Sequence, residues 1–130
     1  MKHEELTNLI IKAFYKVYNI LGYGFIEKVY HQALYLELLS NELKVEKQKR
    51  MSVRYLENIV GEFYADLVVA DMVIIEVKAI DYMIPQNEIQ LLNYLKSSPI
   101  EIGLLLNFGE KPQIKRKVFN NENKRPGIMY

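Results

Sequence analysis

The sequence contains no cysteine. This absence excludes disulfide bonds, a thiolate nucleophile and zinc or iron–sulfur sites with cysteine ligands. It suits a reducing compartment, so we expect a cytoplasmic protein. The sequence also lacks an apolar run of about 18 residues, the length that a membrane span needs, and its first ten residues lack the apolar segment of a signal peptide. We therefore expect a soluble chain without a membrane partner.

Neither charge dominates, because 17 Lys and Arg stand against 16 Asp and Glu, a formal net charge of +1. The average hides an asymmetry, since residues 111–130 contain six basic side chains and one acidic side chain. A second basic cluster lies in the middle of the chain, at Lys44, Lys47, Lys49, Arg50 and Arg54. Two interpretations remain open: an ordinary solvated surface with a frayed tail, or attraction to the phosphates of a nucleic acid.

Length and apolar content predict a single domain over residues 1–130. The chain has 130 residues, half of them hydrophobic, which is enough for one real core and too little for a separate substrate domain. Residues 112–130 are expected to form a basic, partly flexible tail, with 115–118 as a short edge strand or loop.

The apolar pattern changes period along the chain. Spacings of three and four residues predict helices at about 4–20 and 25–43. Alternation then predicts strands at 45–57 and 59–70, paired as a hairpin. Residues 72–80 are mostly apolar, which is typical of a central strand covered on both faces.

The second half of the chain predicts a crossover connection. Pro85 suits a first helical position, so a helix is expected at about 86–96. It leads to another buried strand at 100–108, which would lie parallel to the strand at 72–80. The predicted sheet is therefore mixed.

Charged residues interrupt two of the apolar strands. Glu76 and Lys78 are two residues apart, so they project from the same face of a strand. A tight turn near 71–72 would pair residues whose numbers sum to about 143, which places Asp66 opposite Val77, beside both charges. Two carboxylates and an ammonium then meet, as needed to hold a divalent cation and a lysine near a phosphate. The alternative is an ion pair at a solvated strand end.

These residues resemble a known family. Asp66 followed by Glu76-Val77-Lys78 resembles the D…(D/E)-x-K signature of the PD-(D/E)XK nuclease superfamily, with Ala65 where the family often has Pro. Residues 24–30, GFIEKVY, are similar to the motif of the GxxExxY proteins, a bacterial and archaeal branch. Gln90 and Tyr94 resemble the Q-x-x-x-Y element of exonuclease-like branches.

The resemblance implies a fold and a metal site. The fold would be α/β, with a restriction-endonuclease-like core, a mixed β-sheet flanked by helices and two N-terminal helices. Asp66, Glu76 and the carbonyl of Val77 would bind Mg²⁺ or Mn²⁺, and Glu27 would bind it directly or through water. Lys78 would stabilise charge beside the attacking water or the phosphate.

The resemblance also implies contacts with nucleic acid, either DNA or RNA. Gln90 would hydrogen-bond near the metal or the substrate, with Tyr94 one turn further along the same helix face. Basic side chains of the two clusters would contact the phosphate backbone along its length: Lys47, Lys49, Arg50, Arg54, Lys115, Arg116 and Lys117.

Structural interpretations compete with these roles. A glutamate such as Glu27 is favoured at a helix N-terminus by the dipole alone, and Gly22 and Gly24 end the first helix in any case. Tyr30 and Tyr94 lie on or beside apolar stripes, where core packing competes with base stacking. Gln90 would suit an exposed face.

Other chemistries find little support. Neither His3 nor His31 has a second His or a carboxylate four residues further along, so both are expected to be surface residues. The sequence lacks a G-x-S-x-G motif, a phosphate-binding glycine loop and a dinucleotide fingerprint.

The predicted function is metal-dependent hydrolysis of a nucleic-acid phosphodiester. One alternative is a non-catalytic module that binds nucleic acid or protein and keeps the nuclease fold. Another is a nuclease subunit that needs a partner, such as a second copy of the chain in a homodimer.

Overall fold

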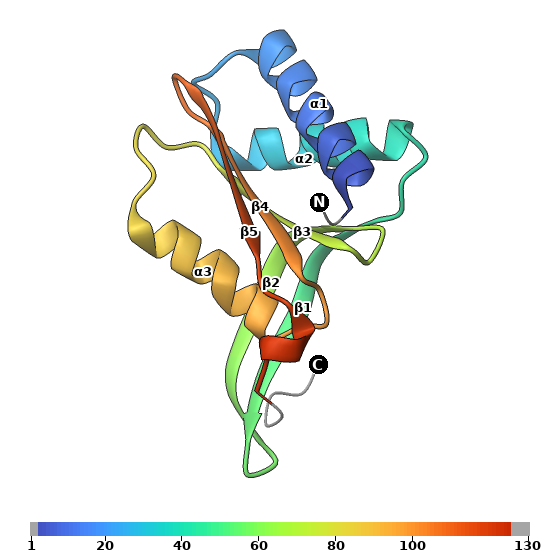
Figure 1. The fold of residues 1–130 in the computed structure, drawn as a ribbon. Helices are drawn as coiled ribbons and strands as arrows, with labels where there is room; N and C mark the ends of the chain where they lie inside the picture. Colours follow the sequence, from blue (N-terminus) through green and yellow to red (C-terminus); the bar gives the residue numbers. More distant parts are fainter. Residues whose placement is uncertain (1–2, 126–130) are drawn as a thin grey trace.

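A computed structural model describes residues 3–125 as a mixed sheet between helices (Figure 1). The elements in chain order are α1 (Glu4–Leu21), α2 (Glu27–Ser40), β1 (Val45–Tyr55), β2 (Asn58–Val69), β3 (Val73–Lys78), α3 (Pro85–Lys96), β4 (Ile102–Phe108), β5 (Pro112–Val118) and the 3₁₀ helix η1 (Asn121–Asn123). The strands lie side by side in the order β1-β2-β3-β4-β5. All neighbours pair antiparallel except β3 and β4, which pair parallel through the α3 crossover. The predicted α/β fold and crossover are confirmed.

Each face of the sheet carries its own core. On one face, α1 and α2 cover Val73, Ile75 and Val77 of β3. On the other face, Leu91 and Leu95 of α3 pack with residues of β3 and β4. The apolar side chains of β3 are therefore buried on both sides, as its continuous apolar sequence predicts.

A stack of aromatic rings ties α1 and α2 to the sheet. Phe108 of β4 lies 4.6 Å from Phe14 of α1 and 4.5 Å from Tyr30 of α2, measured between ring centroids. The Tyr30 hydroxyl donates a hydrogen bond to the carbonyl of Gly22 at 2.6 Å. Gly22 has a φ of 69°, a left-handed conformation that glycine adopts without strain and that ends α1. Tyr30 is thus a packing residue that also fixes the entry into α2.

The register of β2 and β3 differs from the prediction by one residue. Leu67 pairs with Ile75 and Val69 with Val73, so facing residues sum to 142 and Asp66 lies opposite Glu76. The reason is the turn, which uses three residues instead of two, with Ala70 and Asp71 at φ values of 52° and 56°.

The edge strand expected at 115–118 is confirmed but begins earlier, and the flexible tail expected from residue 112 is wrong up to residue 125. Residues 112–118 form the edge strand β5, which pairs with β4 along its whole length. The following segment is also anchored, since the backbone N–H of Asn121 donates to Glu101 Oε2 at 2.7 Å and Lys124 Nζ donates to the carbonyl of Ser98 at 2.7 Å. The expectation of disorder over 126–130 lies outside the described residues.

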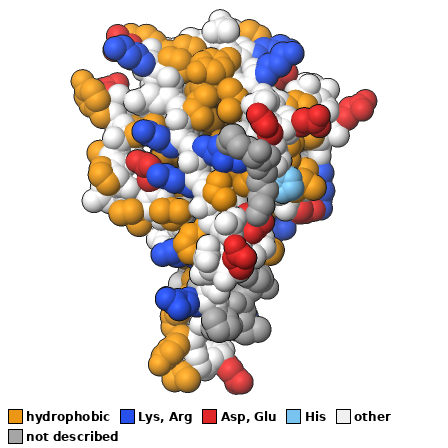
Figure 2. All heavy atoms as spheres, in the orientation of Figure 1, with side chains coloured by type: hydrophobic (Ala, Val, Ile, Leu, Met, Phe, Trp, Pro, Cys, Tyr) orange, Lys and Arg blue, Asp and Glu red, His pale blue; other side chains and the backbone are white. Residues whose placement is uncertain are grey.

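The β1–β2 hairpin extends beyond the rest of the sheet, because β3 pairs with only three residues of β2. Figure 1 shows it as a projecting arm, and Figure 2 shows apolar side chains at its end. Tyr55 and Leu56 at this end are 68% and 77% exposed.

The crossover depends on close contact between α3 and β4. A Cβ at Gly103 of β4 would lie 2.6 Å from Leu91 Cδ1 and 2.9 Å from Leu91 Cγ. We therefore expect Gly103→Ala to lower the free energy of unfolding by about 1–3 kcal/mol, because the packed α3 must shift. Gly61→Ala is the control, since its Cβ would meet only ordinary contacts of 3.6 Å and longer. Urea denaturation measures both; equal stabilities would contradict this packing.

Candidate active site

Two carboxylates meet where β2 and β3 separate. The backbone pairing of these strands ends at Leu67 and Ile75. Beyond that point the backbone N–H of Asp66 donates to Glu76 Oε1 at 3.0 Å, and the backbone N–H of Val77 donates to Asp66 Oδ2 at 2.8 Å. The two side chains therefore replace backbone hydrogen bonds of the ladder. The structure brings together Asp66, Glu76 and the backbone of Val77, as the sequence predicts.

Glu76 is a buried acid, with 3% of its surface exposed. Burial raises its pKa to about 8, and the negative charge of Asp66 adds to the effect, while Lys78 opposes it. A carboxyl in this environment favours a bound proton or a bound cation over an isolated negative charge.

Glu27 lies at the rim of the site, as the first residue of α2. Its side chain is exposed, yet partial desolvation raises its pKa; the charge of Lys78 lowers it and that of Asp66 raises it. Glu27, Asp66, Glu76 and Lys78 therefore lie within electrostatic reach of one another.

The residues fit a divalent metal in part. The carboxylates of buried Glu76 and half-buried Asp66, with a neighbouring carbonyl, are the hard oxygen ligands that Mg²⁺ prefers. Within residues 3–125, however, no three His, Asp or Glu side chains lie close enough to hold a metal ion together. Glu27 therefore does not form a three-carboxylate cluster with Asp66 and Glu76 in this conformation.

Lys78 is the last residue of β3 and is half-buried. Among the described residues, its ammonium forms no ion pair within 4.0 Å with Asp66, Glu76 or Glu27. The alternative of a structural Asp66–Lys78 ion pair is therefore not observed. Its charge acts on Glu27 and Glu76 from a longer distance.

His31 belongs to the site, although a surface position was predicted. Its Nε2 lies 3.1 Å from the backbone carbonyl of Asp66, so Nε2 carries the proton of this hydrogen bond. The β1–β2 ladder skips the pair Gln48 and Asp66, and Gln48 has a φ of 49°. The backbone carbonyl of Asp66 thus accepts a hydrogen bond from His31, at a position where β1 does not pair with Asp66. The signal in the sequence was its spacing of four residues from Glu27, which places both on one helix face.

Gln90 and Tyr94 lie one turn apart on α3. Tyr94 is only 4% exposed, and its ring packs edge-on against Phe63 at 5.5 Å. Burial raises the pKa of Tyr94, as do the charges of Glu76 and Asp66, while the Gln90 side chain lowers it. Tyr94 therefore offers no ring face to a base in this conformation, which favours core packing over base stacking. It places a neutral hydroxyl near the carboxylates instead.

A cleft of about 640 Å³ opens beside Asp66, lined by Glu27, Lys28, His31, Gln32, Lys47, Gln48 and Asp66. Lys47 is the member of the predicted basic clusters that reaches this cleft. Its Nζ donates to Gln32 Oε1 at 2.6 Å and lies 4.3 Å from the centroid of the Tyr35 ring.

The other basic residues lie elsewhere, and several have acidic partners. Arg50 pairs with Glu62 at 2.6 Å, and Lys117 pairs with Glu88 at 2.6 Å. Arg54 lies on the arm, and Lys115 and Arg116 lie on the edge strand β5. These clusters do not gather beside the carboxylates.

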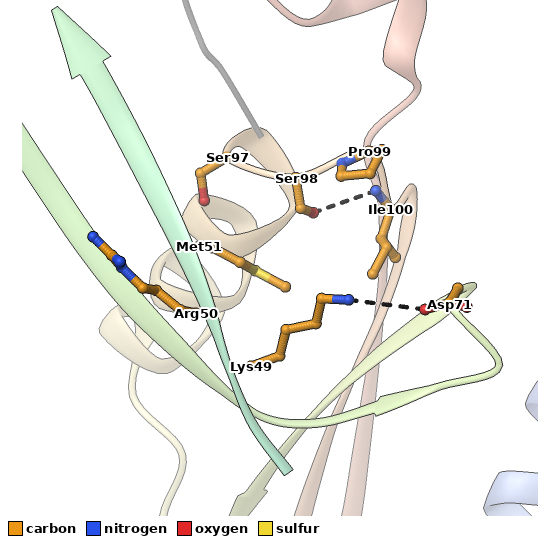
Figure 3. Close-up of a pocket in the computed structure, with 8 residues that line it drawn as sticks. All are labelled: Lys49, Arg50, Met51, Asp71, Ser97, Ser98, Pro99 and Ile100. Atoms are coloured by element: carbon orange, nitrogen blue, oxygen red, sulfur yellow. Dashed lines mark hydrogen bonds and ion pairs between the residues drawn. The ribbon is translucent and has the colours of Figure 1, made fainter. Parts of the chain in front are cut away.

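Lys49 borders a second, smaller pocket, which Figure 3 shows. Lys49 Nζ lies 3.8 Å from Asp71 Oδ1 at its mouth, and the volume is about 120 Å³. Besides Lys49 and Asp71, the pocket is lined by Arg50, Met51 and residues 97–100, so it shares no residue with the carboxylate site.

The raised pKa of Glu76 predicts an unusual pH dependence of stability without metal. The folded state keeps a proton between pH 4.5 and about 8 that the unfolded state releases, so stability should fall as pH rises through this interval. Glu76→Gln still accepts from Asp66 and removes the titration; at pH 8 we expect it to be about 1–3 kcal/mol more stable than wild type, and similar near pH 4.5. Thermal unfolding with chelator measures this.

The control for this titration is Glu57→Gln, an exposed glutamate in the turn at the end of the arm. Asp66→Asn should also remain folded or become slightly more stable at neutral pH, since it relieves repulsion and keeps the acceptor for Val77. Parallel pH profiles for wild type and Glu76→Gln would contradict the assignment.

The contact of His31 with Asp66 predicts a local effect. His31→Ala should cost about 1 kcal/mol and speed hydrogen exchange at the amides of Asp66 and Val77, which depend on the position of Asp66. Lys28→Ala, an exposed neighbour on α2, is the control. Unchanged exchange at both amides would show that His31 does not hold Asp66 in place.

Comparisons with known proteins agree with this geometry. The sequence model of one family, described as the PD-(D/E)XK nuclease superfamily, matches residues 4–117. The crystal structure of SSO0001 superposes on 89% of this chain with a TM-score of 0.60 at 19% sequence identity, which shows a shared fold. The chain spans 58% of that protein's length.

A search of curated proteins found no significant match. Among residues 3–125, none of the helices has the length and apolar character of a membrane span. The family match covers both carboxylates, Lys78 and Glu27, and on this basis the chain belongs to the PD-(D/E)XK nuclease superfamily.

Proposed function

We propose that this chain is a metal-dependent nuclease of the GxxExxY branch, which hydrolyses phosphodiester bonds of nucleic acid. The observation that carries the proposal is the junction of Asp66 and Glu76 across the gap between β2 and β3, with Lys78 two residues further along the same strand. Superfamily members usually are nucleases that use divalent metals, and Mg²⁺ or Mn²⁺ is the proposed cofactor.

The metal would be held by Asp66, Glu76 and the carbonyl of Val77, with Glu27 acting through water. When bound, it would lower the pKa of a water and neutralise charge on the phosphate. The carboxylates of Asp66 and Glu76 would be held in place as ligands, because each accepts a hydrogen bond from the backbone of the other strand. His31 would restrain Asp66 through its hydrogen bond to the backbone carbonyl.

Lys78 would act on the phosphate and the attacking water. Its ammonium has no carboxylate within 4.0 Å among the described residues, so it is available to the substrate. A positive charge there stabilises negative charge that develops on the phosphate oxygens. Gln90 and Tyr94 would support the site from α3 by keeping a hydroxyl near Glu76.

A non-catalytic binding module is the second candidate. Within the part of the chain that the structure describes, no three acidic or histidine side chains form a metal cluster, which favours this candidate. The ion pairs of Arg50 and Lys117 with acidic residues favour it too. Binding of nucleic acid without cleavage would support it.

The proposal predicts that Glu76→Ala and Lys78→Ala each lower cleavage at least 100-fold. Each variant is incubated with single- and double-stranded DNA and RNA in Mg²⁺ or Mn²⁺, and products are resolved on denaturing gels. Glu62→Ala and Lys16→Ala are the matched controls, because they remove the same charges outside the site. Mn²⁺ binding, measured by calorimetry, should be lost in Glu76→Ala and retained in Lys78→Ala. Equal cleavage by wild type and both variants would refute the assignment.

A further inference from the structure

Large apolar side chains are exposed on two segments that border the site. One segment, residues 22–26, leads directly into Glu27, and the other, residues 79–84, follows Lys78. We call these the entry segment and the exit segment. The exposed fractions are 59% for Tyr23, 50% for Phe25, 70% for Ile26, 84% for Tyr82 and 52% for Ile84.

Both segments are anchored to the same part of the sheet. In the entry segment, the backbone N–H of Phe25 donates to the hydroxyl of Tyr30 at 3.2 Å, and the Tyr30 ring stacks on Phe108 at the end of β4. In the exit segment, the backbone N–H of Ile80 donates to Asn107 Oδ1 at 3.0 Å. Figure 1 shows the two segments and the β4–β5 turn on the same side of the fold.

The β4–β5 turn connects the two segments. The Tyr18 hydroxyl, just before the entry segment, donates to the carbonyl of Gly109 at 3.0 Å. Tyr82 of the exit segment lines a hollow together with Glu110 and Lys111 of the same turn. We call the two segments together with this turn the rim, which borders Glu27 and Lys78.

The basic residue of this rim is Lys111 of the turn, which follows Glu110, and the two segments themselves offer no cation to a phosphate. Neither segment contains Lys or Arg, and the one charged residue in them is Asp81. Proteins that follow a duplex do so chiefly by cationic contacts to its backbone. Exposed aromatic rings instead provide faces on which unpaired bases stack. In a duplex the faces of the bases are covered by neighbouring base pairs.

We propose that the site acts on single-stranded nucleic acid, with Tyr82 and the aromatic residues of the entry segment stacking on unpaired bases next to the scissile phosphate. The inference rests on the proposed nucleic-acid site and names its substrate class. Lys28 and Lys47 in the cleft beside Asp66 then contact the phosphates on the other side of the site.

Binding is measured by fluorescence anisotropy with a labelled 20-nucleotide strand and its duplex, in Ca²⁺ in place of Mg²⁺. We expect wild type to bind the single strand at least 10-fold more tightly than the duplex. Tyr82→Ala should weaken single-strand binding about 5- to 100-fold, and Tyr82→Phe should restore it because the ring remains. Tyr55→Ala is the control, since this tyrosine is 68% exposed on the remote arm.

Salt dependence separates stacking from charge. Tyr82→Ala should leave the slope of log affinity against log salt unchanged, because no phosphate contact is lost, whereas Lys47→Ala should make it shallower. Equal binding of strand and duplex, or equal effects of Tyr82→Ala and Tyr55→Ala, would overturn the inference. So would a loss of self-association or protein binding in Tyr82→Ala with unchanged single-strand affinity.

Cleavage distinguishes the two proposals. If wild type cuts single strands and duplexes at equal rates, the nuclease assignment stands and the single-strand inference falls. If wild type cuts nothing but binds single strands through Tyr82, the catalytic proposal falls and the stacking rim stands.

Discussion

The site depends on the exchange of hydrogen bonds between Asp66 and Glu76 at the point where β2 and β3 part. Separating strands would leave backbone N–H groups without partners in a buried place, which is costly. Here each N–H finds a carboxylate from the other strand. The same contacts that close the end of the ladder therefore hold two acidic side chains together, where repulsion would otherwise drive them apart.

The packing around this acidic pair keeps Glu76 buried. β3 is covered by helices on both faces, so Glu76 cannot turn to solvent without breaking a core. The stack of Phe14, Phe108 and Tyr30 fixes the start of α2, and with it the positions of Glu27 and His31. The tyrosine of the GFIEKVY segment thus contributes to the site through packing, by setting where the helix begins.

The sequence predicted the helices and strands well, and the register between strands less well. Helices, strands and the parallel crossover followed from period and turn residues, because these signals are local. The register of β2 and β3 was wrong by one residue, since a three-residue turn with two left-handed residues has no distinctive signal in Ala70-Asp71-Met72. Strand β5 was partly missed because its basic, alternating sequence resembles an exposed tail until β4 offers it backbone partners.

The sequence alone determined the layered α/β fold and the set of acidic residues with Lys78, because apolar periodicity and charges placed inside apolar strands are written in local order. The tertiary structure decided which groups touch. In the folded chain His31 contacts the carbonyl of Asp66, and Tyr94 is buried against Phe63. Arg50 and Lys117 form ion pairs with acidic residues. Such contacts join residues distant in the chain, and their distances follow from packing that no local pattern contains.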